Sequence, residues 1–428
     1  MSNFEFLPDE KILDIAVFLD LPSISRLCQT NRRFNNIICN SEWFWQQKFF
    51  QDYNFIEWGR SWKELYNNYT DVWIFGDDSF GEFECETKIV KQVANIKAKQ
   101  VSSGSNYVAI IDHKDNVWTF GSNYWGQLGL GDNKNKHSPV QIACALPNIK
   151  AKQSPVQIPN IKAKQISTGS IHSIMIDLDN NVWTFGRNYY GTLGLGDNVN
   201  RNIPTQIPNI KARQVSAGDR HTAIIDLDNN VWTFGHNGWG ELGLGDTNER
   251  KIPVQIRNIK AKQISAGQDH TIIIDFEDNV WTFGCNNDGQ LGLGDNLNRN
   301  SPEQIRNLKV KQVFAGDNTA IIDFDNNVWT FGNNEFGQLG LGDTKNRNIP
   351  IQIPNIKARQ VNLRHNQAAI IDLESNLWSF GLYNQLEFGD HQIRNSPIQI
   401  AHTKVRATNV KAQQISIGFY LTIMIGTV

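Results

Sequence analysis

The sequence predicts a mainly β protein, a seven-bladed β-propeller over residues 71–428, with a small all-α module at the N-terminus. Three observations lead to this fold class. A tryptophan motif recurs seven times at a nearly constant spacing, and each repeat contains four short β-rich runs. Residues 1–70 lack this period and place their apolar side chains at helical spacing instead.

The repeat is anchored by the motif Asn-Val-Trp-Thr-Phe-Gly or a close variant of it. Successive anchors are 45, 65, 49, 49, 48 and 49 residues apart. The long spacing contains a local duplication, in which Ser-Pro-Val-Gln-Ile begins at Ser138 and again at Ser154. The anchors define units one to seven and are, in order, Trp73, Trp118, Trp183, Trp232, Trp281, Trp329 and Trp378.

The fourth unit shows the strand pattern clearly. From Gln214 onward it contains the runs QVSAG, HTAIID, NVWTFG and PVQI, separated by glycine and Asp/Asn turn signals. Four strands at a period near 49 residues, with glycine-rich turns, are typical of one propeller blade. The β-branched content excludes a helical solenoid.

The two ends of the repeat region complement each other. Trp73 is not preceded by the first two strands of a unit, whereas the segment from Gln414 supplies two such strands with no anchor after them. We therefore expect the C-terminal strands to pair with the N-terminal ones and close the ring, because closure removes the exposed edge of an open array.

The loop after most anchors has the form G-x-N-x-x-G-Q-L-G-L-G-D, as in GSNYWGQLGLGD from Gly121 and GNNEFGQLGLGD from Gly332. This pattern resembles the repeat of the regulator of chromosome condensation family, and the resemblance covers residues 71–428. The loops GDDSFGEFECE from Gly76 and GLYNQLEFGD from Gly381 depart from the pattern, so we expect less regular closure there. Recurrence of the glycine-rich segment indicates blade architecture and not a nucleotide-binding fingerprint.

The N-terminal module places apolar residues at helical spacing after Pro8, a residue that the first helical turn tolerates. Its segment from Leu7 to Trp45 resembles the F-box, whose members bind the S-phase-kinase-associated adaptor of cullin-RING ubiquitin ligases. Phe34 stands where many members have Trp, and a plain capping helical domain is the alternative. The resemblance assigns adaptor binding to Leu7, Pro8, Glu10, Ile12, Leu13, Ile15, Leu19, Ser23, Ile24 and Leu27.

These patterns predict three segments: an F-box-like module at residues 1–55, a linker or packing helix at 56–70, and the propeller at 71–428. The middle segment carries Trp58 and Trp62, which suit a helix packed against the propeller, although a simple linker is the alternative. The module is too small to bury all its apolar residues alone, so a partner surface is expected to cover some of them.

Charge and composition narrow the partner classes. With 41 basic and 43 acidic residues the formal net charge is -2, which disfavours nucleic acid as a partner. Five cysteines without a C-x-x-C pair disfavour a disulfide framework and a structural zinc site, and favour an intracellular compartment, cytoplasmic or nuclear. No secretory signal and no membrane-length apolar run are present. We expect no cofactor, no metal and no membrane contact.

One face of the ring is the candidate surface for a target protein. Antiparallel order places the first-to-second and third-to-fourth turns of each unit on this face. Aromatic and arginine side chains gather in these loops, and both types are enriched at binding hot spots. The alternative is that the aromatic rings pack over neighbouring loops and the basic residues bond loop carbonyls. The candidates are Tyr124, Trp125, Tyr189, Tyr190, Trp239, Phe336, Arg201, Arg250, Arg299 and Arg347.

Other clusters favour a structural interpretation. Aspartates such as Asp226 and Asp228 lie in Asp-x-Asp-Asn-Asn turns on the opposite face, where they suit turn chemistry better than metal binding. His172, His221 and His270 share a position that other units fill with Tyr107 or Gln367, so we expect no catalytic role. The sequence contains no phosphate-binding loop, no His-Glu-x-x-His motif and no nucleophile elbow.

The sequence thus supports a non-catalytic adaptor of a cullin-RING ligase, in which the F-box binds the S-phase-kinase-associated adaptor and cullin scaffold and the propeller binds an unknown target. The alternative is a guanine-nucleotide exchange factor for the small GTPase Ran, or a chromatin binder, as some relatives of the repeat family are. A further relative, the plant ultraviolet-B photoreceptor, has a Gly-Trp-Arg-His-Thr turn where this chain has Gly-Asp-Arg-His-Thr from Gly218, which disfavours photoreception.

Overall fold

The computed structural model describes residues 71–76, 89–141, 161–382, 393–400, 411–418 and 421–427, together with Ala16, Ile37 and Ile38. The chain divides into two compact parts, one mainly Met1–Asp71 with Val93–Lys97, the other mainly Val72–Gln92 with Ala98–Gly426. The predicted adaptor-binding residues lie outside the described residues, as do Trp58, Trp62, most of the duplicated segment and most of both irregular loops. Among the described residues, no helix has the length and apolar character needed to cross a membrane.

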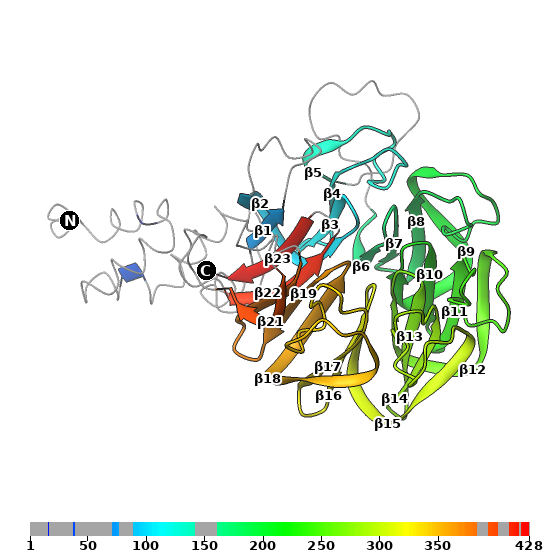
Figure 1. The fold of residues 1–428 in the computed structure, drawn as a ribbon. Coiled ribbons are helices and arrows are strands. Elements are labelled where there is room, and N and C mark those ends of the chain that lie inside the picture. Colours follow the sequence, from blue (N-terminus) through cyan, green and yellow to red (C-terminus); the bar gives the residue numbers. More distant parts are fainter. Residues whose placement is uncertain are drawn as a thin grey trace, which may run out of the picture. The chain divides into compact units, whose positions relative to one another are not determined.

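The repeat region consists of strands joined by short turns (Figure 1). The strands are β1 Asp71–Gly76, β2 Ile89–Ser103, β3 Tyr107–Asp112, β4 Val117–Gly121, β5 Lys136–Gln141, β6 Ala163–Thr168, β7 His172–Asp177, β8 Asn181–Gly186, β9 Arg201–Ala217, β10 His221–Asp226, β11 Asn230–Gly235, β12 Arg250–Ala266, β13 His270–Asp275, β14 Asn279–Gly284, β15 Arg299–Ala315, β16 Thr319–Asp323, β17 Asn327–Gly332, β18 Arg347–Arg364, β19 Gln367–Asp372, β20 Leu377–Gly381, β21 Arg394–Gln399, β22 Lys411–Ile417 and β23 Leu421–Thr427.

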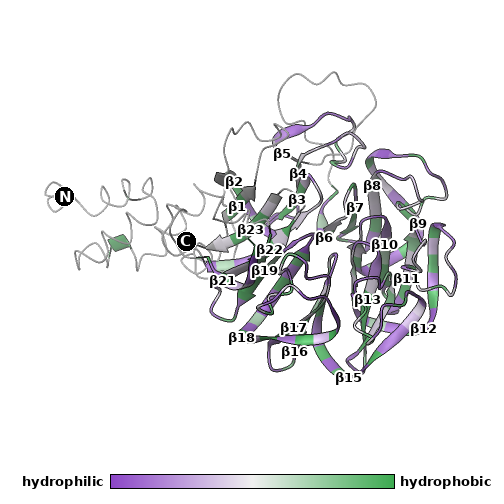
Figure 2. Cartoon of the chain, in the orientation of Figure 1, coloured by the Kyte–Doolittle hydropathy of each residue, from purple (hydrophilic) through white to green (hydrophobic). Residues whose placement is uncertain are grey.

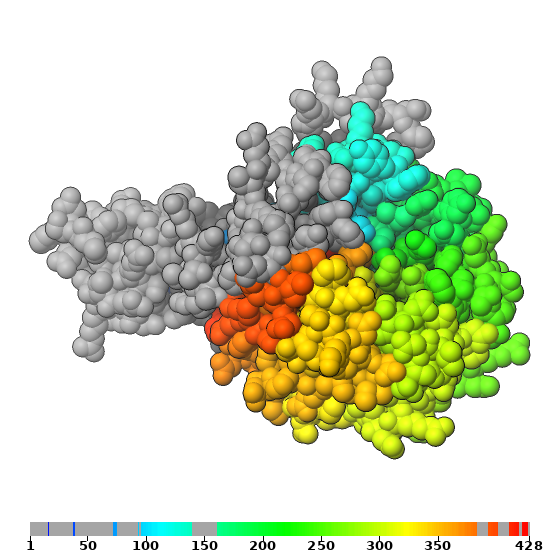
Figure 3. Space-filling view, in the orientation of Figure 1, coloured from blue at the N-terminus to red at the C-terminus, as the bar shows by residue number. Residues whose placement is uncertain are grey.

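The strands pair in chain order, in the sequences β22-β23-β1-β2-β3-β4-β5 and β21 down to β6. Within the fourth unit, β10 pairs antiparallel with β9 and with β11, so that Ile224 lies opposite Val215 and Trp232. When each long crossing strand is counted in both of the units that it joins, the strand order fits the seven predicted blades of four strands. In Figure 3 the groups follow one another in chain order around the visible face, from cyan through green and yellow to orange.

The fourth strand of one unit continues into the first strand of the next. β9, β12 and β15 each run for 17 residues, whereas the sequence predicts two short strands separated by a crossing. The chain bends within these strands at Asn209, Asn258 and Asn307, which have φ values of 60°, 62° and 58°. Asparagine tolerates this left-handed conformation better than most residues, so the bend interrupts the ladder without ending the strand. Hydrophobic and hydrophilic segments alternate along β15 and β18 (Figure 2).

The C-terminal strands pair with the first strand of the repeat region, which is the pairing that the sequence predicts for ring closure. β23 is hydrogen-bonded to β1, the strand of the first anchor, although the two lie at opposite ends of the repeat region. On the far side of β22, the backbone N–H of Val101 donates to Oε1 of Gln414 at 3.1 Å, and that of Ser103 donates to Oγ of Ser416 at 2.9 Å. The last strands are therefore bonded both to the first unit and to the second.

Glutamine side chains link most neighbouring units. The Nε2 amide of Gln214 donates to the carbonyl of Ile264 at 3.0 Å, and the N–H of Ile264 donates back to Oε1 of Gln214 at 3.2 Å. The side chain thus bonds the first strand of the next unit as a neighbouring strand would. Equivalent pairs join Gln100 to Ile166, Gln165 to Val215, Gln263 to Val313, Gln360 to Ile415 and Gln414 to Val101.

The hydrophobic core lies between adjacent units. Phe234, fully buried, packs on Ile174 and Ile207 of the preceding unit, and burying such a ring contributes roughly 1.5–3 kcal/mol. Gly194 has a φ of +70°, and a Cβ there would lie 2.7 Å from Cε2 of Phe234. The glycine of the repeated Gly-Leu-Gly segment therefore allows the next unit's ring to pack closely, consistent with its predicted architectural role.

Candidate functional site

The candidate aromatic residues lie in the loops between the third and fourth strands of their units. Tyr124, Trp125, Tyr189 and Trp239 are exposed, with 69%, 40%, 61% and 39% of their surface accessible. Tyr190 and Phe336 are half-buried. Exposed aromatic side chains that are grouped in neighbouring loops mark a surface available for contact.

Three of the candidate residues, Trp125, Tyr189 and Tyr190, lie in one cluster with two residues that were not candidates. The guanidinium carbon of Arg187 lies 4.6 Å from the ring centroid of Trp125 and 5.5 Å from that of Tyr189. Tyr189 contacts Tyr190 edge to face at 4.8 Å, and Tyr190 contacts His236 at the same distance. Among the described residues, these ring contacts do not extend to Trp239 or Phe336. We name the cluster Trp125, Arg187, Tyr189, Tyr190 and His236 the aromatic patch.

The aromatic patch crosses three successive units, from the second to the fourth. Arg187 and His236 were not predicted as site residues, although each directly follows the glycine that ends its third strand. The same position is Ser122, Cys285 and Asn333 in other units. This variation at an otherwise regular position was the available signal, but only the packing of neighbouring loops shows which ring each side chain contacts.

A buried asparagine holds each of these loops. The side chain of Asn188 donates to the carbonyl and to Oδ1 of Asp197, both at 3.0 Å, and its Oδ1 accepts from the N–H of Leu193 at 2.9 Å. Asn123, Asn237, Asn286 and Asn334 make the same bonds in their units. The patch is therefore built on loops of fixed conformation, which lowers the entropic cost of binding.

The repeated basic residues are paired within their own loops. Arg250 donates from Nη2 to Oδ2 of Asp246 at 2.6 Å and from Nη1 to the carbonyl of Asn248 at 2.7 Å. Arg201, Arg299 and Arg347 bond Asp197, Asp295 and Asp343 in the same way. The hydrogen bond from Arg250 is the main cause that lowers the pKa of Asp246. Since each guanidinium has its own carboxylate, these arginines form ion pairs that secure the loop, and their part in target binding stays a prediction.

The aspartates of the opposite face close the second-to-third turns. Asp226 accepts at Oδ1 from the N–H groups of Asp228 and Asn230, and at Oδ2 from the Asn230 side chain and the Trp232 indole, at 2.8–2.9 Å. Burial alone would raise the pKa of Asp226, but these bonds lower it. The geometry agrees with the turn role predicted from the sequence, and the bond to the indole accounts for the anchoring tryptophan of units two to seven.

The three repeated histidines are buried links between units. Nε2 of His221 is 2.9 Å from the hydroxyl of Thr271 in the next unit, and that hydroxyl donates its proton to the carbonyl of Glu241 at 2.9 Å. The threonine oxygen therefore accepts from His221, which places the proton on Nε2. His172 and His270 bond Thr222 and Thr319 likewise. These contacts support the structural interpretation of the histidines.

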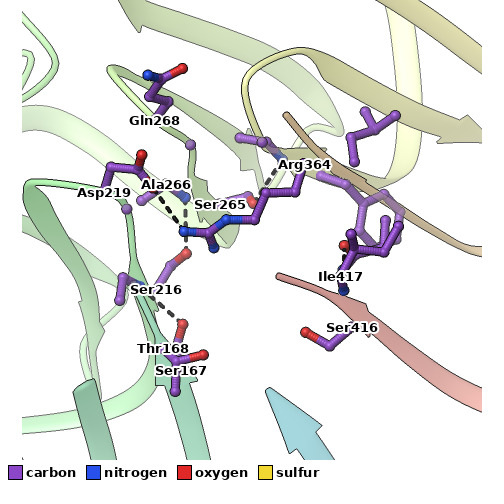
Figure 4. Close-up of a pocket in the computed structure, with 18 of the residues that line it drawn as sticks. Ser167, Thr168, Ser216, Asp219, Ser265, Ala266, Gln268, Arg364, Ser416 and Ile417 are labelled. Carbon is purple, nitrogen blue, oxygen red and sulfur yellow. Dashed lines mark hydrogen bonds and ion pairs between the residues drawn. The ribbon is translucent and has the colours of Figure 1, made fainter. Parts of the chain in front are cut away.

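A cavity of about 150 Å³ lies where the innermost strands meet, and Figure 4 shows its wall of serine and threonine side chains. Arg364 enters it from the seventh unit, at the position where the six other units have glycine. Its Nη2 donates to Oδ1 of Asp219 at 2.9 Å and to Oγ of Ser170 at 3.3 Å. One side chain thus bonds the third and fourth units across the centre of the ring.

Family comparisons agree with this architecture. Residues 56–318 match the model of the RCC1-like domain, and residues 310–338 and 325–365 match models of the regulator of chromosome condensation (RCC1) repeat. Residues 4–51 match the F-box-like model. Both resemblances noted in the sequence are therefore confirmed.

Solved structures with the same fold have low sequence identity. Yeast RCC1 (Prp20), in a complex with Kap60, aligns with a TM-score of 0.72 at 16% identity, over 85% of this chain and 91% of that one. Human WBSCR16 aligns with a TM-score of 0.69 at 17% identity, over 84% and 99%. These similarities establish the propeller fold.

Curated relatives match only in part. The ultraviolet-B receptor UVR8 of Arabidopsis thaliana is 30% identical over 26% of this chain and 22% of its own length. The probable E3 ubiquitin-protein ligase HERC4 of Homo sapiens is 29% identical over 27% and 10%, and the X-linked retinitis pigmentosa GTPase regulator of Homo sapiens is 31% identical over 24% and 9%. The chain spans less than a quarter of the length of each of these relatives.

Proposed function

Since this chain belongs to the RCC1-like domain family and also carries an F-box-like segment, we propose that it is the substrate-recognition adaptor of an SCF-type cullin-RING E3 ubiquitin ligase. The main support for this proposal is the presence of both modules in one chain. The F-box-like segment would hold the S-phase-kinase-associated adaptor, and the propeller would present a target protein to the ubiquitin-loaded enzyme. The proposal includes an intracellular location, where such ligases act.

The proposed division of labour follows the segments predicted from the sequence. Residues 1–55 bind the adaptor through the positions from Leu7 to Leu27, residues 56–70 connect the parts, and residues 71–428 bind the target. The rate of ubiquitin transfer rises because the target is held near the charged enzyme and not because this chain supplies a nucleophile. The buried state of His172, His221 and His270 supports a non-catalytic role, since none is accessible to a substrate.

The aromatic patch is the proposed target-binding surface. Its tryptophan and tyrosine rings combine apolar area with few rotatable bonds, and Arg187 holds two of them in a cation–π arrangement. Tyr124, Trp239 and Phe336 lie in equivalent loops and extend the proposed surface around the same face. The paired arginines, Arg201 to Arg347, would contribute at its rim.

The first prediction concerns the adaptor. The double substitution Leu7→Ala and Pro8→Ala in the full chain should weaken binding to the purified S-phase-kinase-associated adaptor by at least about tenfold, because it removes apolar contacts at the centre of the proposed interface. Binding is measured by titration calorimetry or co-purification. The matched control is Trp125→Ala, which should leave adaptor binding unchanged.

If the double variant binds the S-phase-kinase-associated adaptor with unchanged affinity, the proposed ligase-adaptor role is wrong. The alternative, exchange activity on a Ran-like GTPase, is tested in parallel by nucleotide release from the GTPase with and without the full chain. We expect no acceleration of release. Acceleration together with intact adaptor binding in the double variant would replace the proposal by the exchange-factor alternative.

A further inference from the structure

Three side chains with metal-binding atoms meet between the fourth and fifth units. His236 directly follows β11, Glu241 lies in the loop between β11 and β12, and Asp269 lies in the turn between β12 and β13. One ligand atom from each of these residues lies within 4.8 Å of the others. Within the part of the chain that the structure describes, these three residues form the one group of three or more histidine, cysteine, aspartate or glutamate side chains whose ligand atoms lie this close together.

Glu241 departs from the repeat. The position of Glu241 is glutamine in the second, fifth and sixth units, as Gln127, Gln290 and Gln338. The glutamine Oε1 accepts from the N–H two residues earlier, at 2.9 Å in Gln127 and Gln338, and Glu241 accepts from Trp239 in the same way at 2.8 Å. The loop therefore needs an acceptor oxygen here, but it does not need the negative charge.

The buried carboxylate oxygens of Glu241 and Asp269 would be stabilised by a bound cation. The side chain of Glu241 is fully buried and pairs with Nδ1 of His236. Oδ1 of Asp269 is also buried and has no hydrogen-bond partner among the described residues. Burial, followed by the charge of Glu241, raises the pKa of Asp269 to about 6. A buried carboxylate oxygen without a partner is costly, and its neighbours are a second carboxylate and an imidazole.

We propose that His236, Glu241 and Asp269 bind a divalent transition-metal ion, with Zn²⁺ the best match to one imidazole nitrogen and two carboxylate oxygens. Zinc bonds such ligands at about 2.0–2.2 Å, so the ligand atoms around one ion lie roughly 3.4 Å apart. Rotation of the side chains would bring the three ligand atoms, which lie within 4.8 Å of one another, to this spacing. The ion takes the place of the proton shared by His236 and Glu241, and that proton leaves to solvent.

The surroundings resemble the outer shell of a metal site. The N–H of Trp239 orients Glu241, and the backbone N–H of His236 is fixed by the carbonyl of Arg220 at 2.9 Å. Hydrogen bonds of this kind hold ligands in position and tune their basicity. Cys285, the residue equivalent to His236 in the fifth unit, is buried, and its N–H donates to the carbonyl of Asp269 at 2.8 Å.

A bound ion would have two structural consequences. It would join the fourth and fifth units, because Asp269 belongs to one and the other two ligands to its neighbour. It would also fix the ring of His236, which contacts Tyr190 in the aromatic patch at 4.8 Å. Three protein ligands leave at least one coordination position for water or for a group from another molecule.

The competing interpretation is an ion network without metal, in which a protonated His236 and Arg220 neutralise the two carboxylates. Arg220 is close enough that its charge lowers the pKa of Asp269. The two interpretations differ in one measurable respect, since only the metal site makes stability depend on added Zn²⁺. Substitutions borrowed from other units of the chain separate the two without disturbing the loop.

The experiment uses the full chain, freed of metal by chelation, and titrates it with Co²⁺ followed by visible absorption and with Zn²⁺ followed by calorimetry. Glu241→Gln and His236→Asn copy the sixth unit, and Asp269→Asn copies Asn106 of the second. We expect binding of one ion per chain, a dissociation constant raised at least about tenfold in each variant, and a smaller rise in the thermal midpoint on adding Zn²⁺ in these variants than in the wild type. Glu249→Gln, an exposed carboxylate of the same loop, is the matched control and should bind like the wild type.

Two results would overturn the metal site. One is the absence of a Co²⁺ spectrum and of a Zn²⁺-dependent midpoint in the wild-type chain. The other is equal ion binding by the wild type and by Glu241→Gln, which would place the ion elsewhere. Because the readout is metal binding, failure here is distinguishable from failure of adaptor binding.

Discussion

The junction between the fourth and fifth units and the junction between the sixth and seventh solve the same packing problem differently. At the first, Gln214 makes two hydrogen bonds to Ile264, and Ser216 accepts from the N–H of Ala266 at 2.9 Å. His221 adds its bond to Thr271. Three side chains of one unit thus bond the next along the whole length of its inner strands.

The junction between the sixth and seventh units lacks this ladder. Oε1 of Gln312 is buried without a partner among the described residues, and Phe314 stands where most other units have serine. Asn318, at the histidine position, accepts from the N–H of Asn333 in its own unit at 2.6 Å. In place of the ladder, Nδ1 of His365 pairs with Oδ2 of Asp317 at 3.3 Å.

The difference shows two ways of holding the ring. Regular junctions rely on repeated neutral hydrogen bonds between adjacent units. At the irregular junction His365 pairs with Asp317, and Arg364, the last residue of β18, crosses the cavity to Asp219 of the fourth unit (Figure 4). We therefore expect the two kinds of junction to respond differently to pH, to loss of hydrogen bonds and to salt.

The largest expected effect is acid destabilisation through the regular junctions. Burial is the main cause that lowers the pKa of His172 and His270 to about 3 and that of His221 to about 4. Below an unfolded pKa of about 6.5, the unfolded chain binds a proton at each site that the folded chain does not bind. The free energy of unfolding should therefore fall as pH drops from about 6.5 to 4, by roughly 1.4 kcal/mol per pH unit and histidine. Asp269, whose pKa is raised to about 6, has the opposite effect on stability. As the pH falls below about 6, the folded chain binds a proton at Asp269 before the unfolded chain does, which offsets the contribution of about one histidine.

The test is His221→Gln, which copies Gln367 of the seventh unit. Denaturant unfolding at several pH values should show a slope smaller by about 1.4 kcal/mol per pH unit than in the wild type. His137→Gln, at an exposed position, is the matched control and should keep the wild-type slope. An unaltered slope in His221→Gln would mean that the buried imidazole does not carry the pH dependence.

A smaller effect distinguishes the glutamine positions of the two junctions. Gln214→Leu removes both bonds to Ile264 and leaves a buried N–H and carbonyl unsatisfied, at a cost of about 1–3 kcal/mol each. Gln312→Leu replaces a side chain whose buried oxygen already lacks a partner, so its cost should stay below about 1 kcal/mol. Midpoints of guanidinium unfolding measure both, and equal losses would contradict the proposed difference between the junctions.

Much of the fold could be predicted because the tryptophan motif recurs at a nearly constant spacing along the sequence. The tryptophan anchors identify the units, and the incomplete first and last units predict ring closure by the strands after Gln414. The continuous crossing strands were missed, because a positive φ at residues such as Asn209 bends a strand without a break in its composition. Trp73 marks the limit of the regularity. Its indole N–H is buried without a partner among the described residues, since Gly426 occupies the position of the turn aspartate.

The candidate surface was less predictable than the fold. Exposed rings such as Trp125 and Tyr189 could be recognised from their loop position. Arg187 could not, because it contacts Trp125 of the preceding unit, and the two residues are far apart in the sequence. The cluster of His236, Glu241 and Asp269 has no sequence spacing typical of metal ligands. Spacing motifs describe ligands on one element, whereas these three come from two units and are neighbours only in the folded ring.

The smallest expected effect is the ion pair across the cavity. The Arg364 and Asp219 side chains are 13% and 17% exposed, so solvent screens their attraction less than that of the loop pair Arg250–Asp246, at 24% and 38%. A double-mutant cycle with Arg364→Gln and Asp219→Asn should give a coupling of about 1 kcal/mol, against less than about 0.5 kcal/mol for the same substitutions at Arg250 and Asp246. Raising the salt concentration should reduce the loop coupling proportionally more. Equal couplings would show that the cross-ring contact contributes no more than an ordinary surface pair.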